Sequence, residues 1–283
     1  MKKNYQEKIY KTFELLKNAN KILVGGGAGL STAAGLEYKG RRFSRNFADF
    51  IEEYGLTNMY EAGFYPFLTQ EEKWAYWSKH IKLNRYDELK NNVYPILLEL
   101  IKDKEYFVIT TNADGLFERN GFSKEKLFVV QGDYGKFQCA SSCHNTLYDN
   151  QKQINDMVSH QKAFRIPSNL IPSCPLCKGK MEVNVRKDAS FVEDKTWHDS
   201  YEKYKEFVSS FKDENIALLE LGVGYNTPSI IKYPFEHITS KHSNVSLIRM
   251  NKEANEISFI NKHKTLAFGE SISNVFYDLN VYM

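Results

Sequence analysis

Four cysteines in two close pairs are the residues of this sequence with the most specific chemistry. Cys139 and Cys143 form one pair, and Cys174 and Cys177 form the other. In a reducing compartment, two such pairs are typical of a Zn²⁺ ion held by four thiolates. A closed site of this kind leaves no open position for water, so we expect structural zinc, with free or redox-active cysteines as the alternative. His144 could also be a ligand, although four thiolates already complete the shell.

A glycine-rich turn is the second feature with possible chemistry. Residues 21–24, Lys-Ile-Leu-Val, are typical of a short buried strand and lead into Gly25-Gly-Gly-Ala-Gly29, and a helix-like segment follows from Ser31. Glycines let the backbone approach a phosphate closely, and the start of the next helix offers unpaired N–H groups. The pattern G-x-G-x-x-G fails at Thr32, and no P-loop lysine follows. The turn is therefore either a phosphate-binding loop or a tight packing turn.

Four further apolar runs end in small or polar residues. They are residues 106–109, 127–130, 216–221 and 245–250. Short apolar runs alternating with helical stretches indicate a parallel sheet covered on both faces, in which ligands bind at the carboxyl ends of the strands. We therefore expect an α/β fold with a binding crevice along that edge.

The remaining segments divide the chain into three parts. We expect a Rossmann-like domain built from residues 1–45, 104–132 and 196–283. Residues 46–103 are typical of a helical module, with Trp74 and Trp77 as core anchors. Residues 133–195 contain all four cysteines and several prolines, which predicts a small, loop-rich zinc-binding module.

The composition excludes several classes of protein. Of 283 residues, 42% are hydrophobic and 26% are charged, as in ordinary globular proteins. The net charge of +3 is too small for general nucleic-acid binding, so we expect no nucleic-acid partner. No stretch reaches the ~20 apolar residues of a membrane span, and no apolar run follows the charged start as in a secretory signal. We expect a cytoplasmic protein that does not bind a membrane.

Six motifs in a fixed order resemble those of the sirtuins, a family of NAD-consuming enzymes. Residues 27–36 resemble the opening motif, and residues 110–116 resemble T-Q-N-x-D-x-L. Gln131-Gly132 stands at the place of a catalytic His-Gly pair, and the two cysteine pairs match the zinc module. Residues 222–228 and 248–251 resemble the last two motifs. The resemblance implies a Rossmann-like NAD-binding domain, a smaller zinc-binding and helical domain, and NAD between them.

The resemblance also implies a role for individual residues. Asn112 and Asp114 would hold the nicotinamide ribose, although Asn112 could instead be a turn or helix N-cap residue. The implied catalytic residues are Asn112, Asp114, Gln131 and Arg186. The implied NAD-binding residues are Gly27, Ala28, Gly29, Ser31, Gly35, Leu36, Arg42, Phe43, Asn112, Asp114, Gln131, Gly222, Val223 and Asn251, with Ala28, Gly29 and Ser31 at the phosphates and Gly222 and Asn251 near the adenosine.

Three positions depart from the deacylating members of the family. Gln131 replaces the histidine base, and an amide cannot take a proton near neutral pH, which argues against efficient deacylation. After Gly35 the pattern G-I-P-D-F-R is lost, and Arg42 and Phe43 would take over its Phe-Arg part after a shift. Arg186 places a permanent cation near the channel for an apolar acyl-lysine, unless it is simply a surface arginine.

Together these departures resemble the macrodomain-linked sirtuins of bacteria and fungi. Members of that subgroup are protein mono-ADP-ribosyltransferases that modify a lipoylated carrier protein of the glycine-cleavage H type, and a macrodomain hydrolase removes the mark. Our first hypothesis is therefore an NAD-dependent protein mono-ADP-ribosyltransferase. A weak NAD-dependent lysine deacylase and a non-catalytic NAD-sensing module are the alternatives.

Overall fold

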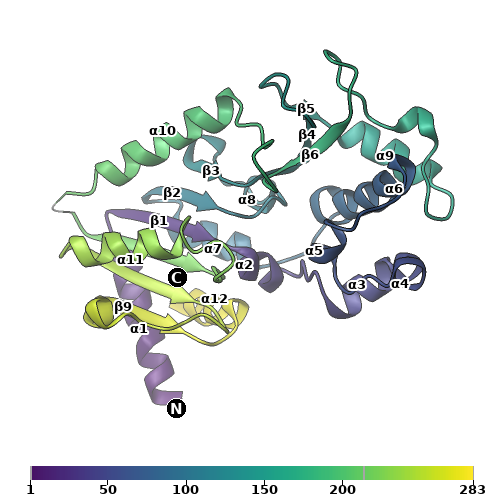
Figure 1. Cartoon of the computed structure of the whole chain (residues 1–283). Helices are drawn as coiled ribbons and strands as arrows, with labels where there is room; N and C mark the ends of the chain where they lie inside the picture. Colours follow the sequence, from purple (N-terminus) through teal and green to yellow (C-terminus); the bar gives the residue numbers. More distant parts are fainter. Residues whose placement is uncertain (1, 213, 283) are drawn as a thin grey trace.

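A central parallel sheet organises the larger of two domains (Figure 1). The computed structural model describes residues 2–212 and 214–282. Within these residues the sheet has six strands, and every pairing is parallel. In spatial order they are β3 (Leu127–Val129), β2 (Glu105–Thr110), β1 (Lys21–Gly26), β7 (Ile216–Leu221), β8 (Val245–Met250) and β9 (Thr265–Phe268). This arrangement confirms the predicted α/β fold with a Rossmann-like sheet.

The order of the strands reverses between β1 and β7. From β1 the chain continues outward through β2 and β3, and from β7 it continues outward on the other side through β8 and β9. The registers align the strand ends, because Gly26 pairs with both Thr110 and Leu221. In open parallel sheets such a reversal leaves a crevice at the carboxyl ends of the strands, where ligands bind.

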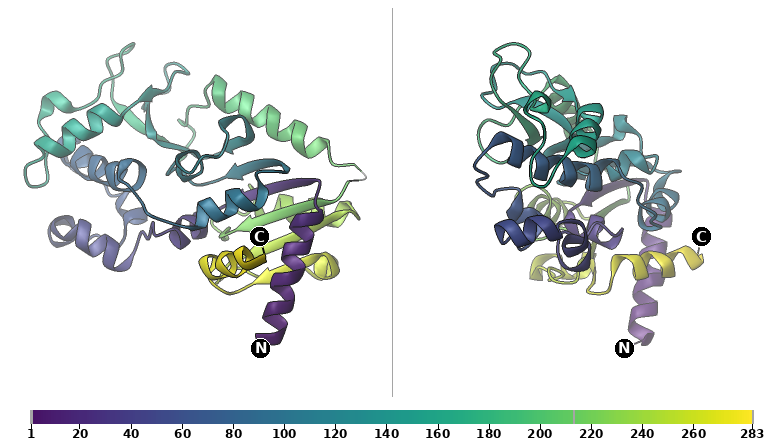
Figure 2. Two further views of the ribbon diagram at one scale, coloured as in Figure 1. Left: turned by 180° about the vertical axis from the view of Figure 1, so that it is seen from behind. Right: turned by 90° about the vertical axis from the view of Figure 1, so that its right-hand side faces the viewer.

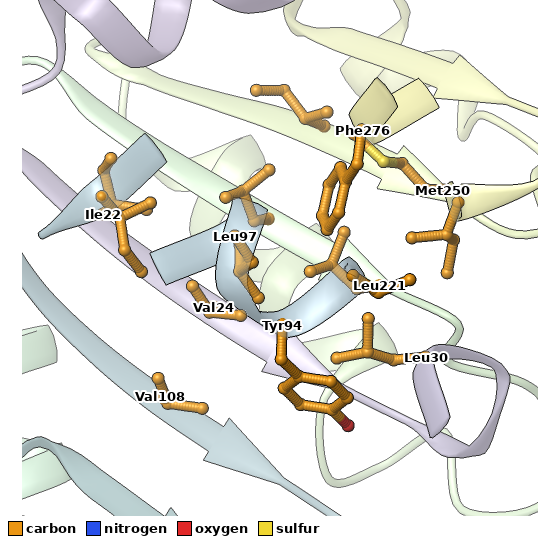
Figure 3. Packing of buried hydrophobic residues seen from close by; sticks show 14 of the residues in the cluster. Ile22, Val24, Leu30, Tyr94, Leu97, Val108, Leu221, Met250 and Phe276 are labelled. Carbon is orange, nitrogen blue, oxygen red and sulfur yellow. The ribbon is translucent and has the colours of Figure 1, made fainter. Parts of the chain in front are cut away.

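Helices cover both faces of this sheet. On one face lie α1 (Lys2–Asn18), α7 (Val93–Ile101) and α12 (Ile272–Leu279), and on the other lie α10 (Lys195–Ser209) and α11 (Lys232–Lys241). Figure 3 shows Tyr94 and Leu97 of α7 and Phe276 of α12 beside Val24 and Leu221 of the sheet. Strands that are buried on both faces need a largely apolar sequence, as residues 216–219 have.

The smaller domain combines helices with a short antiparallel sheet. The helices are α3 (Gly40–Asn46), α4 (Ala48–Tyr54), α5 (Met59–Ala62), α6 (Gln70–Ile81), the π-helical turn η1 (Lys82–Tyr86) and α9 (Gln151–His160). The sheet has the order β5 (Tyr148–Asp149), β4 (Gly132–Cys139) and β6 (Met181–Val185). One apolar cluster joins the helices and this sheet, with the rings of Trp74 and Phe137 5.0 Å apart. The helical and cysteine-containing modules therefore pack as one domain, which lies to one side of the large sheet (Figure 2).

The packing differs from the expected division of the chain in two places. Helix α7 was expected in the helical module, but its apolar side chains, Tyr94 and Leu97 among them, pack in the core of the large sheet. Residues 40–45 were expected in the Rossmann-like part, but Phe43 stacks on Phe47 of the smaller domain at 5.5 Å. In both cases the burial of a large side chain decides the assignment, since the local sequence is helical either way.

Strand β9 was not expected from the sequence. It has four residues, which is too short for its apolar pattern to be distinguished from a buried turn. The remaining short elements are α2 (Ala28–Ala33), α8 (Leu116–Arg119), η2 (Lys124–Lys126), η3 (Ser168–Leu170), η4 (Phe259–Lys264) and η5 (Asn280–Tyr282). None of the helices in the described ranges combines the length and the apolar character that a bilayer-spanning segment needs.

Candidate active site and metal site

The glycine-rich turn after β1 packs directly on the turn after β7. The Gly29 amide donates to the Gly222 carbonyl at 2.9 Å, and the Gly27 amide donates to the Leu221 carbonyl at 2.9 Å. A β-carbon on Gly27 would lie 2.6 Å from the Gly222 oxygen. Gly222 itself has a φ of +65° and leaves no space for a β-carbon, which would lie 2.2 Å from the Leu30 nitrogen. Tight backbone packing therefore requires these glycines, and it leaves Ala28 exposed at the crevice.

Asp114 is a buried carboxylate held from two sides. Its Oδ2 accepts a 2.5 Å hydrogen bond from the Ser31 hydroxyl, and its Oδ1 accepts one of 2.9 Å from the Leu116 amide. Only 3% of Asp114 is exposed. Burial raises the pKa of Asp114, and the two hydrogen bonds oppose this because they favour the ionised form. The Ser31 bond also ties the turn after β1 to the loop after β2.

Asn112 lies beside this carboxylate and is 9% exposed. Its Nδ2 donates to the Gly27 carbonyl at 2.9 Å, and its backbone amide donates to the Thr110 hydroxyl at 3.1 Å. It does not cap α8, because Gly115 is the residue that precedes this helix. The side chain thus crosses between two strand ends rather than closing its own turn, which removes the N-cap alternative.

Gln131 lies where β3 leads into β4, and its carbonyl accepts the backbone amide of Arg186 at 3.1 Å. The Arg186 guanidinium binds Glu193 Oε1 at 2.5 Å and lies 4.2 Å from the centroid of the Phe191 ring. Trp197 packs close by, and its indole N–H donates to the Val130 carbonyl at 3.1 Å. The structure therefore brings Arg186 beside Gln131 through the backbone, with its charge paired to Glu193.

The other expected cofactor residues fall into three groups. Leu36 and Phe43 have buried side chains within the apolar clusters of the two domains, so they act as core residues. Arg42 donates to Asn84 Oδ1 at 2.8 Å and to the Leu83 carbonyl at 3.0 Å. Most of the remaining residues lie in the turns that follow the strands of the large sheet, where the Asn251 side chain donates to the Val223 carbonyl at 2.9 Å. Gly35 lies just after α2 and has a φ of +103°.

An aromatic group near Asp114 is not apparent from the sequence. The hydroxyls of Tyr38 and Tyr134 are 3.0 Å apart, and the Tyr134 ring lies 4.9 Å from the buried ring of His80. The pKa of Tyr134 is raised to about 12, mainly by burial and also by the nearby Asp114 charge. Burial lowers the pKa of His80 to about 3. Tyr134 follows Gln131 by three positions, and Tyr38 lies in the segment that departs from the family pattern. The closeness of Tyr134 to Gln131 in the sequence, and the place of Tyr38 in the departing segment, could have pointed to this aromatic group.

The four cysteines converge on one point of the smaller domain. Their sulfur atoms all lie within 4.8 Å of one another, and two of the separations are 3.6 and 3.7 Å. A tetrahedral Zn²⁺ ion with bonds of about 2.3 Å requires sulfurs about 3.8 Å apart, so the cluster fits zinc. His144 lies outside this group, with its Nδ1 3.0 Å from the Cys143 sulfur and its Nε2 2.8 Å from the Tyr148 hydroxyl. His144 is therefore better placed to contact a cysteine thiolate than to bind the metal as a fifth ligand.

Comparisons with known proteins agree with this arrangement. The Sir2 family matches residues 27–212. A protein ADP-ribosyltransferase of Staphylococcus aureus is 37% identical over 274 residues, covering 96% of this chain and 86% of that protein. A probable bifunctional ADP-ribose hydrolase/ADP-ribosyltransferase of Fusarium oxysporum f. sp. cubense is 35% identical over 249 residues, covering 84% of this chain but 41% of that longer protein.

Solved structures support the same assignment at the level of the fold. The complex of Sir2 with a p53 peptide and NAD⁺ aligns with a TM-score of 0.57 over 97% of this chain and 98% of that one, at 15% identity. A Sir2 enzyme bound to a propionylated peptide aligns with a TM-score of 0.55 at 19% identity, over 96% of each chain. With the family match and the relatives above 30% identity, these findings show that the chain belongs to the Sir2 family.

Proposed function

We propose that this protein is an NAD-dependent protein mono-ADP-ribosyltransferase, and that its acceptor is a lipoylated carrier protein of the glycine-cleavage H type. The observation that carries the proposal is an amide, Gln131, at the position of the family's imidazole base, just after β3, with a buried Asn112–Asp114 pair just after the neighbouring strand β2. The names of the Staphylococcus and Fusarium relatives support the same reaction.

The reaction breaks the bond between the ribose C1′ and the nicotinamide nitrogen. Nicotinamide leaves with the bonding electrons, and positive charge develops on the ribose. The Asp114 carboxylate is fixed by Ser31 and by a backbone amide, so it can stabilise this charge without rearranging. Asn112 would orient a ribose hydroxyl, and it does not compete as a nucleophile.

The acceptor then needs no strong base on the enzyme. An ionised aspartate or glutamate of the carrier forms the new bond to C1′, and it has no proton to lose. Gln131 can donate and accept hydrogen bonds at this point but cannot accept a proton. The acceptor carboxylate would replace Glu193 as the partner of Arg186, which explains a cation in a channel that deacylases keep apolar.

The dinucleotide would lie across the strand ends. Ala28 and Gly29 would meet its phosphates, and Gly222, Val223 and Asn251 its adenosine half. The four thiolates would hold structural Zn²⁺ away from the reaction. A macrodomain hydrolase would remove the mark, and the hydrolase named in the longer Fusarium relative supports such a pairing.

The experiment mixes the purified protein, labelled NAD and the carrier with or without its lipoyl group. We expect label on the lipoylated carrier only, and Asn112→Ala should reduce it at least 100-fold. The matched control Asn4→Ala, at an exposed position of α1, should leave labelling unchanged. Free ADP-ribose as the sole product, unaffected by Asn112→Ala, would refute the proposal.

The two alternatives give different results in the same preparation. A weak deacylase removes an acyl group from a lysine peptide with one NAD consumed for each group removed. In that case Gln131→His should change the rate little, whereas a large gain would show that the native chain is not suited to deacylation. A non-catalytic NAD sensor binds NAD in calorimetry and releases no nicotinamide over a long incubation.

A further inference from the structure

Arg85 links the helical part of the smaller domain to the start of β4 in the same domain. It lies in the π-helical turn η1, which directly follows α6. Its Nε binds Asp133 Oδ1 at 2.7 Å and its second terminal nitrogen binds Asp133 Oδ2 at 3.1 Å. The two side chains are only 16% and 22% exposed. A two-point contact with this little exposure fixes Asp133, and with it the backbone two residues after Gln131.

The same guanidinium also packs against the loop after β2. Gly115 follows Asp114 directly and has a φ of +68°. A β-carbon on Gly115 would lie 2.5 Å from the central carbon of the Arg85 guanidinium. Only glycine leaves space for this contact, so Arg85 lies flat on the backbone next to the buried carboxylate.

A backbone bond joins the two loops that Arg85 touches. The Tyr134 amide donates to the Ala113 carbonyl at 2.9 Å. Asp133 Oδ1 also accepts the Gly135 amide at 2.6 Å, which holds the carboxylate toward Arg85. Segments 112–115 and 131–135 thus form one unit, and Arg85 is the cation that connects this unit to α6.

Electrostatics give a second reason to expect that Arg85 influences the buried carboxylate of Asp114. The Asp133 charge raises the pKa of Asp114, and the Arg85 charge lowers it. Neutralising Arg85 would leave Asp133 half-buried without its counter-ion, close to a carboxylate that is already costly to ionise.

We propose that Arg85 is a positioning residue for the Sir2-type reaction, holding the Asn112–Asp114 loop and the Gln131 loop in register with the smaller domain. The inference rests on the proposed function for its kinetic readout. The planar fork of arginine is needed, because lysine offers a point charge that cannot bind both Asp133 oxygens in this plane. A small displacement of reacting groups costs up to about 100-fold in rate.

The experiment compares Arg85→Lys with Arg165→Lys. Arg165 is the control, since it also binds a carboxylate of the smaller domain, Glu72 at 2.8 Å, but lies away from these loops and is more exposed. We expect Arg85→Lys to lower kcat for nicotinamide release about 10- to 100-fold, with KM for NAD changed less than threefold. Arg165→Lys should change neither, and both variants should keep their zinc.

A mutant cycle and hydrogen exchange complete the test. The double variant Asp133→Asn/Arg85→Gln should lose no more activity than the less active of the two single variants, because both substitutions remove the same contact. Amide exchange in segments 112–116 and 131–136 should rise in Arg85→Lys and not in Arg165→Lys.

The inference would be overturned by a kcat within threefold of the wild type, by a rise in KM alone, or by unchanged exchange in both segments. Exchange needs no activity, so it tests Arg85 even if the wild type transfers nothing to a carrier. Conversely, transfer by the wild type with unchanged exchange in Arg85→Lys would reject the positioning role and leave the proposed function standing.

Discussion

The substitution Glu220→Gln should strongly destabilise the larger domain, although it replaces the side chain with one of almost the same size and shape. Glu220 lies in β7 and is 0% exposed. It binds the Lys232 ammonium at 2.9 Å and the Arg249 guanidinium at 2.9 and 2.8 Å. Both cations are themselves buried. A glutamine at this position keeps one acceptor oxygen but carries no negative charge, and the other acceptor of Lys232 is the neutral Ala254 carbonyl at 3.1 Å.

Removing one partner of a buried ion pair costs about 3–5 kcal/mol, since a charge stays in the interior without compensation. For a chain of this length, 1 kcal/mol lowers the melting temperature by about 2 °C, which gives a decrease of roughly 6–10 °C. The matched control is Glu236→Gln. Glu236 binds the same Arg249 at 2.9 Å but is 29% exposed, so its loss should cost about 1 kcal/mol or less.

Thermal unfolding followed by circular dichroism measures both variants under identical conditions. We expect the melting temperature to fall at least three times as far in Glu220→Gln as in Glu236→Gln. Equal decreases, or a change below about 2 °C for Glu220→Gln, would refute the claim that the buried charges depend on this carboxylate.

Three further predictions concern the metal, a glycine and a histidine. Cys174→Ser should lose zinc, measured by mass spectrometry, and should make the smaller domain sensitive to protease, because the metal holds a loop-rich module together. Gly222→Ala should abolish NAD binding in calorimetry and lower the melting temperature, whereas Gly224→Ala, where a β-carbon meets nothing within 4 Å, should do neither. The pKa of His80 is lowered to about 3, so the unfolded chain binds more protons below pH 6.5, and stability falls as the pH drops from 6.5 toward 3. Urea midpoints at pH 7 and pH 5 should therefore differ less in His80→Phe than in the wild type.

The sequence by itself determined most of the fold. Five of the six parallel strands were predictable, because a strand buried on both faces needs a mainly apolar run and the small or polar residues after it mark its end. The two cysteine pairs also predicted a shared metal site, because zinc sites with four cysteines are commonly built from two pairs whose members are close in sequence. The order of the motifs was enough to indicate the family.

Tertiary structure alone decided which distant residues meet. Helix α7 looks like part of the helical module, yet it packs on the large sheet, because its apolar stripe is buried there. Arg85 and Asp133 are 48 positions apart, and Tyr38 and Tyr134 are 96 apart. No local pattern marks such pairs, because their geometry depends on how segments far apart in the sequence pack together. A sequence shows which groups could react, and the packing of the chain decides which of them lie within reach of one another.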